Sequence, residues 1–181
     1  MEPLSVKLLC TGNPNDPTVA SAVKKLWPTA DFASRTTGYD LRFWDAGSET
    51  HFRQQITKYD TFINSSFICN GGQINLLETA FDQWVHAGIT GTIINIGSSA
   101  EWLGVDSQWG NYSIQKRALR DRSLQLNQKN GIKTVHLIAG GLNDGKPCNS
   151  KGLDLLYIAH TIQWILGQSF AIPLIYLEAS N

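Results

Sequence analysis

A tyrosine and a lysine four positions apart, Tyr112 and Lys116, are the residues best suited to chemistry in this sequence. The segment that carries them has a helical pattern, so their side chains are expected on one helix face. A phenol ordinarily has a pKa of about 10, and an ammonium group beside it lowers that pKa by favouring the phenolate. A tyrosine tuned in this way can exchange a proton with a substrate oxygen.

Two serines, Ser98 and Ser99, stand where they could bind the same oxygen. They follow residues 92–96, an apolar run whose β-branched side chains are typical of a buried parallel strand. A lone Tyr-x-x-x-Lys spacing is common by chance. A serine at the end of a neighbouring strand makes a carbonyl or alcohol site a more specific hypothesis.

Short apolar runs alternate with helical segments along the chain. Strands are expected at residues 6–10, 31–34, 61–64, 92–96, 134–138 and 172–176, and helices at residues 17–26, 49–57, 73–86, 111–129 and 153–166. This alternation predicts an α/β fold, with one doubly wound, mostly parallel Rossmann-type sheet and helices on both faces. We expect a single compact domain over residues 1–181. Residues 39–44 follow the second strand too closely for a parallel crossover, so they are either antiparallel to it or barely a strand.

Composition argues against several classes of function. The 15 basic and 15 acidic residues balance, so no basic field is available for general nucleic-acid binding. No apolar run reaches the length of a membrane span, and residues 1–4 lack the pattern of an export signal. Three scattered cysteines are expected to be reduced thiols of a cytoplasmic protein. Four separated histidines have no metal-ligand spacing, so no metal site is expected.

Five motifs in order resemble the short-chain dehydrogenase/reductase family. They are YDTFINSSF (59–67), INLLETAF (74–81), GTIINIGSS (91–99), YSIQKRAL (112–119) and GIKTVHLIAGGLND (131–144). The resemblance implies hydride transfer between a nicotinamide cofactor and an alcohol or carbonyl carbon. It implies that Tyr112 is the general acid/base and that Lys116 lowers the pKa of Tyr112 and binds the nicotinamide ribose. Ser98 would polarise the substrate oxygen, and Asn75 would anchor a proton-relay water.

Two assignments at the substrate end stay open. The Ile-Gly-Ser pattern favours Ser98 as the catalytic serine, whereas the spacing to the tyrosine favours Ser99. We expect Ser98, and the other serine could bond to backbone. Trp102 and Trp109 lie in the loop that lines the substrate site in the family. They either stack on a sugar, a pterin or an aromatic ring, or they pack within the loop.

The resemblance implies NADP as the cofactor, with NAD as the alternative. Arg35 ends the second expected strand, where an arginine can accept the 2′-phosphate of NADP; the alternative is a solvated surface arginine. The acid expected near the adenine is Asp40, or else Asp45. The expected cofactor-binding residues are Gly12, Asn13, Asn15, Arg35, Thr36, Asp40, Asn64, Ser65, Ser66, Tyr112, Lys116 and Gly141.

The first loop departs from the family pattern. Three glycines usually let a pyrophosphate approach a helix N-terminus. Here Gly12 is kept, and Asp16 and Thr18 stand at the second and third positions. We expect Asp16 as N-cap and Pro17 as the first helical residue. Such a cap would use N–H groups and place a negative charge at the phosphate, which weakens binding there, although residues 12–15 could still offer their own N–H groups.

The segment after Gly141 is too short for a helical lid, which predicts an open site, a large substrate, or weak catalysis because water is poorly excluded. The sequence therefore predicts an NAD(P)-dependent oxidoreductase, an NADPH-dependent carbonyl reductase or alcohol dehydrogenase acting on a small molecule. The alternative is a catalytically weak or inactive nucleotide-binding or regulatory module on the same fold.

A homodimer or homotetramer is expected as well, because the family commonly pairs through the helix that carries Tyr112 and Lys116. That helix is unusually polar for a subunit interface, since it carries Arg117, Arg120, Asp121 and Arg122.

Overall fold

Six parallel strands form the main sheet of the computed structural model, which describes residues 6–39, 45–67, 71–146 and 151–179. Their spatial order is β2 (Asp31–Ala33), β1 (Leu8–Thr11), β3 (Thr61–Asn64), β4 (Thr92–Ile96), β5 (Lys133–Ala139) and β8 (Leu174–Leu177). All five neighbouring pairs are parallel. The strands β3 and β4 span the ranges predicted from their apolar and β-branched residues.

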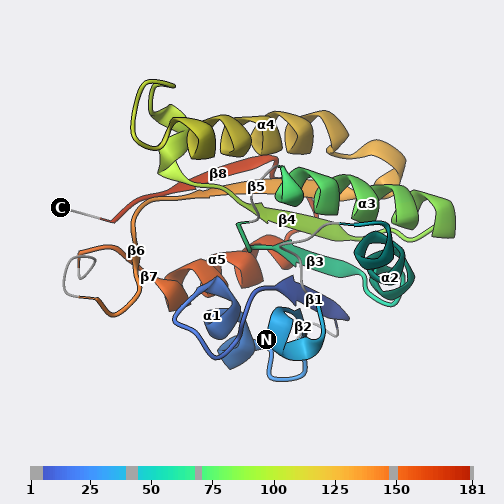
Figure 1. Cartoon of the computed structure of the whole chain (residues 1–181). Helices are drawn as coiled ribbons and strands as arrows, with labels where there is room; N and C mark the ends of the chain where they lie inside the picture. The colour runs from blue at the N-terminus through green and yellow to red at the C-terminus, as the bar shows by residue number, and fades with distance from the viewer. Residues whose placement is uncertain (1–5, 40–44, 68–70, 147–150, 180–181) are drawn as a thin grey trace.

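Helices cover both faces of this sheet (Figure 1). One face carries α1 (Val19–Leu26) and α5 (Leu155–Leu166), and the other carries α2 (Ala46–Ile56), α3 (Gly72–Ala87) and α4 (Gly110–Leu126). From β1 the strand order runs outward in both directions, to β2 on one side and to β3 on the other. The predicted doubly wound α/β fold is therefore confirmed.

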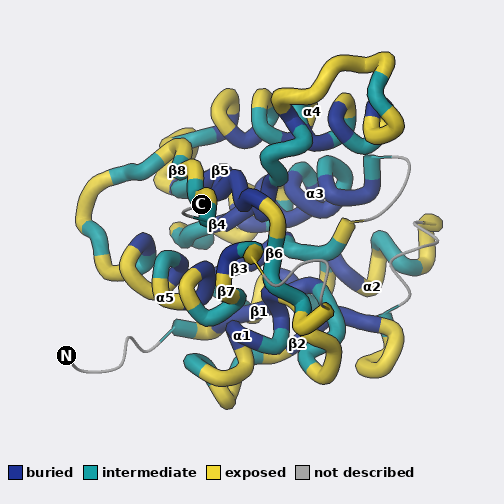
Figure 2. Tube along the Cα trace, turned by 90° about the vertical axis from the view of Figure 1, so that its left-hand side faces the viewer, coloured by how far each residue is buried: buried dark blue, intermediate teal, exposed yellow. Residues whose placement is uncertain are grey.

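Each face of the sheet has its own hydrophobic core. Along β1, Leu8 and Cys10 pack on the side of α1 and α5, whereas Leu9 packs on the side of α2, α3 and α4. This alternation is the period of two that a strand imposes on its side chains. Figure 2 shows the result, with buried segments through the middle of the molecule and exposed ones around its outer surface.

The helix α1 begins two residues later than the sequence predicts. Its N-cap is Thr18, which forms a capping box with Ser21, and the N–H of Thr18 bonds the carbonyl of Asp16 at 2.7 Å. The expectation that Asp16 caps this helix and that Pro17 is its first residue is wrong. The side chains of Thr18 and Ser21 each accept the backbone N–H of the other residue, which satisfies two N–H groups at the helix start. Thr18 is therefore the N-cap, two residues after Asp16.

Three other helices differ from their predicted ranges by more than one residue. The helix α2 begins at Ala46, three residues before its predicted start. The helix α4 ends at Leu126, because Gln128 and Asn130 adopt positive φ angles of 61° and 53°, and the short 3₁₀ turn η3 (Lys129–Gly131) follows. The predicted helix 153–166 begins at Leu155, with the Asp154 carboxylate accepting the N–H of Leu156 at 2.8 Å. The two residues before it form β7 (Leu153–Asp154), which pairs in parallel with β6 (Leu142–Asn143). Residues 39–44 fall largely outside the described residues, which include only Tyr39 of that segment.

The carboxyl ends of the parallel strands meet at one edge of the sheet, where ligands bind in open α/β folds. The residues that follow the strands at this edge are Gly12 after β1, Ser34 after β2, Ser65 after β3, Gly97 after β4 and Gly140 after β5.

Candidate active site

The helix α4 and the end of β4 bring Ser98, Tyr112 and Lys116 together. Lys116 is buried, and its Nζ lies 5.5 Å from the centre of the Tyr112 ring. The Ser98 side chain lies close enough to the Tyr112 phenol to lower its pKa. Ser98 is thus the serine that contacts the tyrosine, and Ser99 is the first residue of the 3₁₀ turn η2 (Ser99–Trp102).

The pKa of Tyr112 is raised above its ordinary value, contrary to the expected lowering by Lys116. Burial of the phenol is the main cause, the hydrogen bond from Ser98 opposes it, and the negative charge of Glu101 adds to it. Burial disfavours the charged phenolate. In this structure Tyr112 is therefore a protonated group, suited to donating a proton to a substrate oxygen.

The ammonium of Lys116 has two protein acceptors. Its Nζ donates to Gln73 Oε1 at 2.7 Å and to the carbonyl of Ile96 at 2.8 Å. Burial lowers the pKa of Lys116 to about 8, and the charge of Glu101 opposes that shift. The lysine is held in place by its hydrogen bonds, and its charge is costly enough to be lost in mildly alkaline solution.

The sequence did not indicate Gln73, because the family resemblance pointed to Asn75 as the residue of this helix that anchors a proton-relay water. Both residues lie in the first turn of α3, but Gln73 is buried and contacts Lys116, whereas Asn75 is half-buried. Gln73 also donates from Nε2 to the carbonyl of Asn64 at 2.9 Å. The sequence holds little that could have identified Gln73 as the partner of Lys116. Gln73 and Asn75 are both amides in the same helical turn, and only side-chain length and direction decide which of them reaches the lysine.

A buried polar network connects this lysine to the sheet. Asn64 Nδ2 donates to the carbonyl of Gln73 at 2.8 Å and to Asn95 Oδ1 at 3.0 Å. Asn95 Nδ2 in turn donates to the hydroxyl of Ser123 on α4 at 3.1 Å. Asn64, expected to bind cofactor, thus ties β3, α3 and β4 together. Such networks fix the relative position of the elements they join.

Aromatic rings surround Tyr112. The ring of Phe67 lies 4.7 Å and that of Trp109 lies 6.2 Å from the Tyr112 ring, both in edge arrangements. Phe67 and Trp109 are both exposed, so they form the outer border of the site. Trp102 is also exposed, and it contacts Tyr176 of β8 and the guanidinium of Arg120 rather than Tyr112.

At the other end of the edge, Gly12 adopts a φ of +125°, a conformation that L side chains rarely take. A Cβ at this position would lie 3.0 Å from Ala20 Cβ and within 3.4 Å of the hydroxyls of Ser65 and Ser66. The N–H groups of Ser65 and Ser66 both donate to Thr11 Oγ1, at 2.8 and 3.0 Å. Three expected cofactor residues, Gly12, Ser65 and Ser66, are therefore brought together where β1 and β3 end.

The loop after Gly12 is closed by its own side chains. Asn13 Nδ2 donates to the Asp16 carboxylate at 2.9 Å, and Asn13 Oδ1 accepts the N–H of Asn15 at 3.1 Å. Because the N-cap is Thr18, no acidic residue lies in the first turn of α1. The Asp16 carboxylate is exposed and bound by Asn13, so it opposes an anion less than a capping aspartate would.

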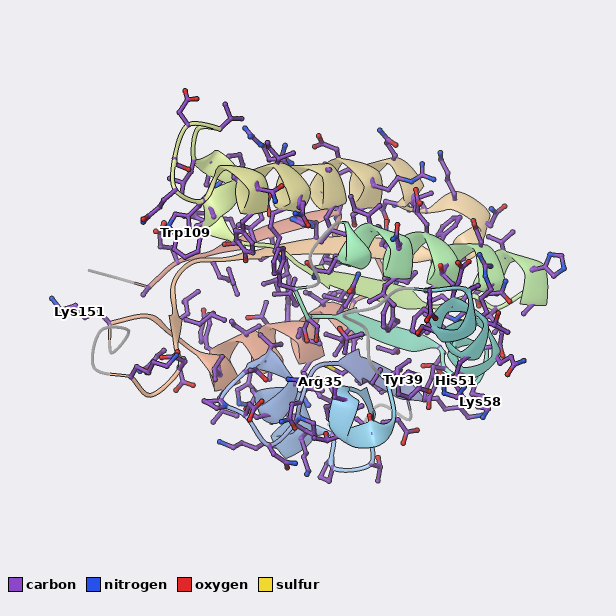
Figure 3. All side chains as sticks on the ribbon, in the orientation of Figure 1. Arg35, Tyr39, His51, Lys58, Trp109 and Lys151 are labelled. Carbon is purple, nitrogen blue, oxygen red and sulfur yellow. The ribbon has the colours of Figure 1, made fainter. Side chains whose placement is uncertain are left out.

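The remaining expected residues lie near the ends of β2 and β5. Arg35 is exposed at the start of the 3₁₀ turn η1 (Arg35–Thr37), where the Thr36 hydroxyl lies 2.7 Å from that of Ser34. Figure 3 shows Arg35 on the lower side of the molecule and Trp109 near the start of α4. Gly141 is exposed, and its carbonyl accepts the N–H of Leu153 at 2.7 Å.

The two candidates for the adenine acid have different outcomes. Asp40 lies outside the described residues. Asp45 is the N-cap of α2 and accepts the N–H of Ser48 at 2.7 Å, a bond that lowers its pKa. Asp45 therefore has a structural role in starting a helix.

In the described part of the chain, no group of three or more His, Cys, Asp or Glu side chains is placed to hold a metal ion. The same residues include no helix with the length and apolar character needed to cross a membrane. Of the three cysteines, Cys10 lies in the core, where burial raises the pKa of its thiol to about 12 and keeps it protonated.

Neither a protein-family model nor a curated protein sequence matches this chain. Solved structures do match it. A short-chain dehydrogenase from Streptomyces avermitilis is 15% identical, with a TM-score of 0.69 over 98% of this chain and 89% of that one. A gluconate 5-dehydrogenase from Burkholderia cenocepacia, solved with NADP and tartrate, is 13% identical, with a TM-score of 0.69 over 96% and 93% of the two chains.

A xylitol dehydrogenase solved with NAD+ is 12% identical, with a TM-score of 0.70 over 96% of this chain and 98% of that one. These structural similarities extend over most of the length of this chain and of each compared protein. The chain therefore has the fold of the short-chain dehydrogenases/reductases, the family that its motifs resemble.

Proposed function

We propose that this protein is an NAD(P)-dependent oxidoreductase that interconverts a carbonyl compound and an alcohol. The observation that carries the proposal is a buried lysine, hydrogen-bonded at the end of β4, whose Nζ lies 5.5 Å from the centre of the Tyr112 ring, with Ser98 beside the tyrosine. A bound nicotinamide would supply the hydride. Tyr112, protonated in this structure, would donate the proton to the substrate oxygen, and Ser98 would hydrogen-bond the same oxygen.

The strand edge fits parts of a dinucleotide. The backbone at Gly12 is free of a side chain. At the start of α1 the capping box uses the N–H groups of Thr18 and Ser21, which leaves those of Val19 and Ala20 for an anion. The Lys116 ammonium already uses two of its three N–H donors on protein acceptors, so one donor remains to reach a ribose hydroxyl. Lys116 is therefore proposed to hold the ribose by its remaining hydrogen-bond capacity.

NADP is the proposed cofactor rather than NAD. An exposed arginine follows β2, and a guanidinium recognises a phosphate with paired hydrogen bonds. Arg35→Glu should therefore lose roughly 10- to 100-fold in the preference for NADPH over NADH, since a charge-assisted hydrogen bond contributes about 1.5–3 kcal/mol. Calorimetric titration with both cofactors measures this ratio, and an unchanged ratio would remove Arg35 from cofactor selection.

The aromatic border suggests the class of substrate. Phe67 and Trp109 flank Tyr112 and expose their rings, so a carbonyl carried by an aromatic or other planar apolar body would gain contacts there. The test of the proposed function is NADPH consumption with a panel of aromatic and aliphatic ketones and aldehydes. Turnover with the aromatic members supports the proposal, and no turnover with any member contradicts it.

A second candidate is a nucleotide-binding module with little or no turnover. Two observations favour it: the pKa of Tyr112 is raised, and the ammonium of Lys116 already donates to two protein acceptors. Calorimetric NADPH binding in the micromolar range without turnover on the whole panel would favour this module over the enzyme.

Two further properties are proposed with their own tests. A homodimer or homotetramer would pair through α4, whose outer surface exposes Ile114 and Leu124; a monomer by light scattering would reject it. A cytoplasmic location stays a prediction from cysteine usage, and fractionation of the producing cells tests it.

A further inference from the structure

A buried carboxylate and a buried imidazole lie behind Ser98, and the proposed reaction does not use either of them. The side chains of Glu101 and His136 are both 0% exposed, and His136 Nε2 lies 2.8 Å from Glu101 Oε1. A carboxylate can only accept, so the imidazole donates its Nε2–H. Glu101 lies on η2 and His136 on β5, and they meet because β4 and β5 pair side by side with Asn95 opposite His136.

The same carboxylate oxygen holds the backbone of the serine. The N–H of Ser98 donates to Glu101 Oε1 at 3.1 Å, and Ser98 Oγ accepts the N–H of Ala100 at 3.2 Å. The bond to Glu101 Oε1 is one half of the capping box of η2, whose other half is the approach of the Glu101 N–H to the Ser98 side chain. Because Ser98 Oγ already accepts a backbone N–H, its single hydroxyl proton is directed away from that N–H and stays available for Tyr112 or a substrate oxygen.

Gly97 makes room for this arrangement. A Cβ at Gly97 would lie 2.3 Å from His136 Nε2 and 2.4 Å from Glu101 Oε1, distances that real contacts do not reach. The residue between the strand and the serine must therefore be a glycine for the two side chains to meet. The pair is built into the end of β4 and is not an accidental contact of a surface loop.

Stability alone is a poor explanation for this pair. Burying a carboxylate is costly even when it is paired, and apolar side chains of similar volume often stabilise a core as well or better. Part of the cost is uncompensated, since His136 Nδ1 has no hydrogen-bond partner among the described residues. The second carboxylate oxygen of Glu101 lies 3.6 Å from Arg120 Nη1, a long contact.

We propose that Glu101 and His136 are positioning residues that hold Ser98 in the orientation needed to bind the substrate oxygen together with Tyr112. Glu101 fixes the backbone of the serine, and His136 fixes Glu101 from the sheet side. This inference rests on the proposed oxidoreductase function, and it adds two residues that neither touch the reacting atoms nor belong to the Ser98, Tyr112 and Lys116 set.

The charge of Glu101 gives the proposal a readout that needs no turnover. The titratable and charged groups that face it are Tyr112, Lys116 and Arg120 from α4 and His136 from β5. The negative charge raises the pKa of both Tyr112 and Lys116. Removing that charge while keeping the shape should therefore lower the pH at which Tyr112 titrates.

The experiment compares Glu101→Gln with Asp121→Asn in the full chain. Asp121 is the matched control, because it is a second carboxylate on Arg120, at 3.0 Å, but it is largely exposed. We expect Glu101→Gln to lower kcat for NADPH-dependent carbonyl reduction by roughly 10- to 100-fold, as misplacement of a catalytic group does. The Kd for NADPH should stay within about twofold, since Glu101 follows β4 and His136 lies on β5, whereas the proposed phosphate site is at the end of β1.

NMR titration of ¹³C-labelled tyrosine measures the second readout. The Tyr112 resonance should titrate at lower pH in Glu101→Gln than in the wild type, and Asp121→Asn should leave it in place. An unchanged kcat together with an unchanged Tyr112 titration in Glu101→Gln would overturn the proposal. If the wild type turns over no carbonyl substrate, the proposed function has failed, and the Tyr112 titration still decides whether Glu101 acts on the site.

Variants of His136 separate positioning from folding. His136→Gln keeps a donor for Glu101, whereas His136→Leu removes it. We expect the glutamine variant to retain most of the wild-type kcat and the leucine variant to lose it, with both proteins folded by circular dichroism. Equal kcat in the two variants would overturn the proposed role of the hydrogen bond from His136 to Glu101. If the leucine variant does not fold, a loss of kcat in the folded glutamine variant would overturn that role instead.

Discussion

The two ends of the sheet's carboxyl edge use their polar groups in opposite ways. At the end of β4, Lys116 and Gln73 are buried and bonded to each other. At the end of β1, the side chains of Asn13, Asn15 and Asp16 lie at or near the surface, and their bonds close only the loop itself. The difference teaches that the end at β4, which we propose is the catalytic end, is preorganised by the protein, whereas the end at β1, the proposed phosphate end, depends on backbone and on few contacts.

The largest expected effect is at the catalytic end. Tyr112→Phe should lower kcat for NADPH-dependent carbonyl reduction by roughly 10²–10⁴-fold, because it removes the proton donor and leaves the ring packing between Phe67 and Trp109 in place. NADPH consumption measures the rate, and calorimetry should give a cofactor Kd close to that of the wild type. A rate equal to that of the wild type would exclude Tyr112 as the acid/base.

The second prediction concerns pH and the burial of Lys116. Its folded pKa of about 8 lies below the ordinary 10.5, so between those values the unfolded chain holds more protons than the folded one. The free energy of unfolding should therefore rise with pH through this window, by at most about 3 kcal/mol, while below pH 8 the cost of the buried charge is fully present.

Urea unfolding of the wild type and Lys116→Met from pH 8 to about 10 measures this contribution. Other groups titrate in the same range, but they are common to both proteins, so the difference between the two slopes isolates Lys116. If the free energies of unfolding of the two proteins change with pH in parallel, Lys116 is not a buried ammonium. The contrast between the ends of β4 and β1 would then be weaker.

Gln73 and Asn75 give the third prediction, which sharpens the catalytic end. Gln73→Leu removes one of the two acceptors of Lys116 and should lower the free energy of unfolding by about 1–3 kcal/mol. Asn75→Leu, a matched change in the same turn of α3, should have a smaller effect on stability. Chemical denaturation of both variants measures the two free energies of unfolding. An equal or larger loss in Asn75→Leu would contradict the view that Gln73, rather than Asn75, is the residue of α3 that holds this end of the site.

The smallest effect is expected at the phosphate end. Asp16→Asn removes the charge near α1 while keeping an oxygen for Asn13. It should tighten NADPH binding by about two- to fivefold, because a charge near a helix N-terminus contributes roughly 0.3–1 kcal/mol. Calorimetric titration measures the Kd, and weaker binding in the variant would mean that the loop shape, not its charge, governs this end.

The sequence predicted the sheet better than it predicted the ends of helices. The ranges of β3 and β4 were right because a buried parallel strand needs a short run of apolar and β-branched side chains. The start of α1 was wrong because Asp16 with Pro17 and Thr18 with Ser21 are both good caps, and the choice depends on how the chain leaves Gly12.

At the candidate site, helical spacing alone was enough to predict one pair, whereas a second pair is joined by the fold and the sequence did not indicate it. Tyr112 and Lys116 share a helix face, so four residues of sequence sufficed to pair them. Glu101 and His136 are 35 residues apart and meet through the pairing of β4 with β5. The direction of the Tyr112 pKa was missed for the same reason, because burial is a property of the packed molecule.

Transfer of deuterium from labelled NADPH is the most direct test of the central claim. The protein is incubated with NADPH that carries deuterium at the transferring position of the nicotinamide, together with an aromatic ketone, and the alcohol product is examined by mass spectrometry. The account predicts that the product carries the deuterium and that Tyr112→Phe forms little of it. Bound NADPH with no deuterium in any product of the carbonyl panel would contradict the account.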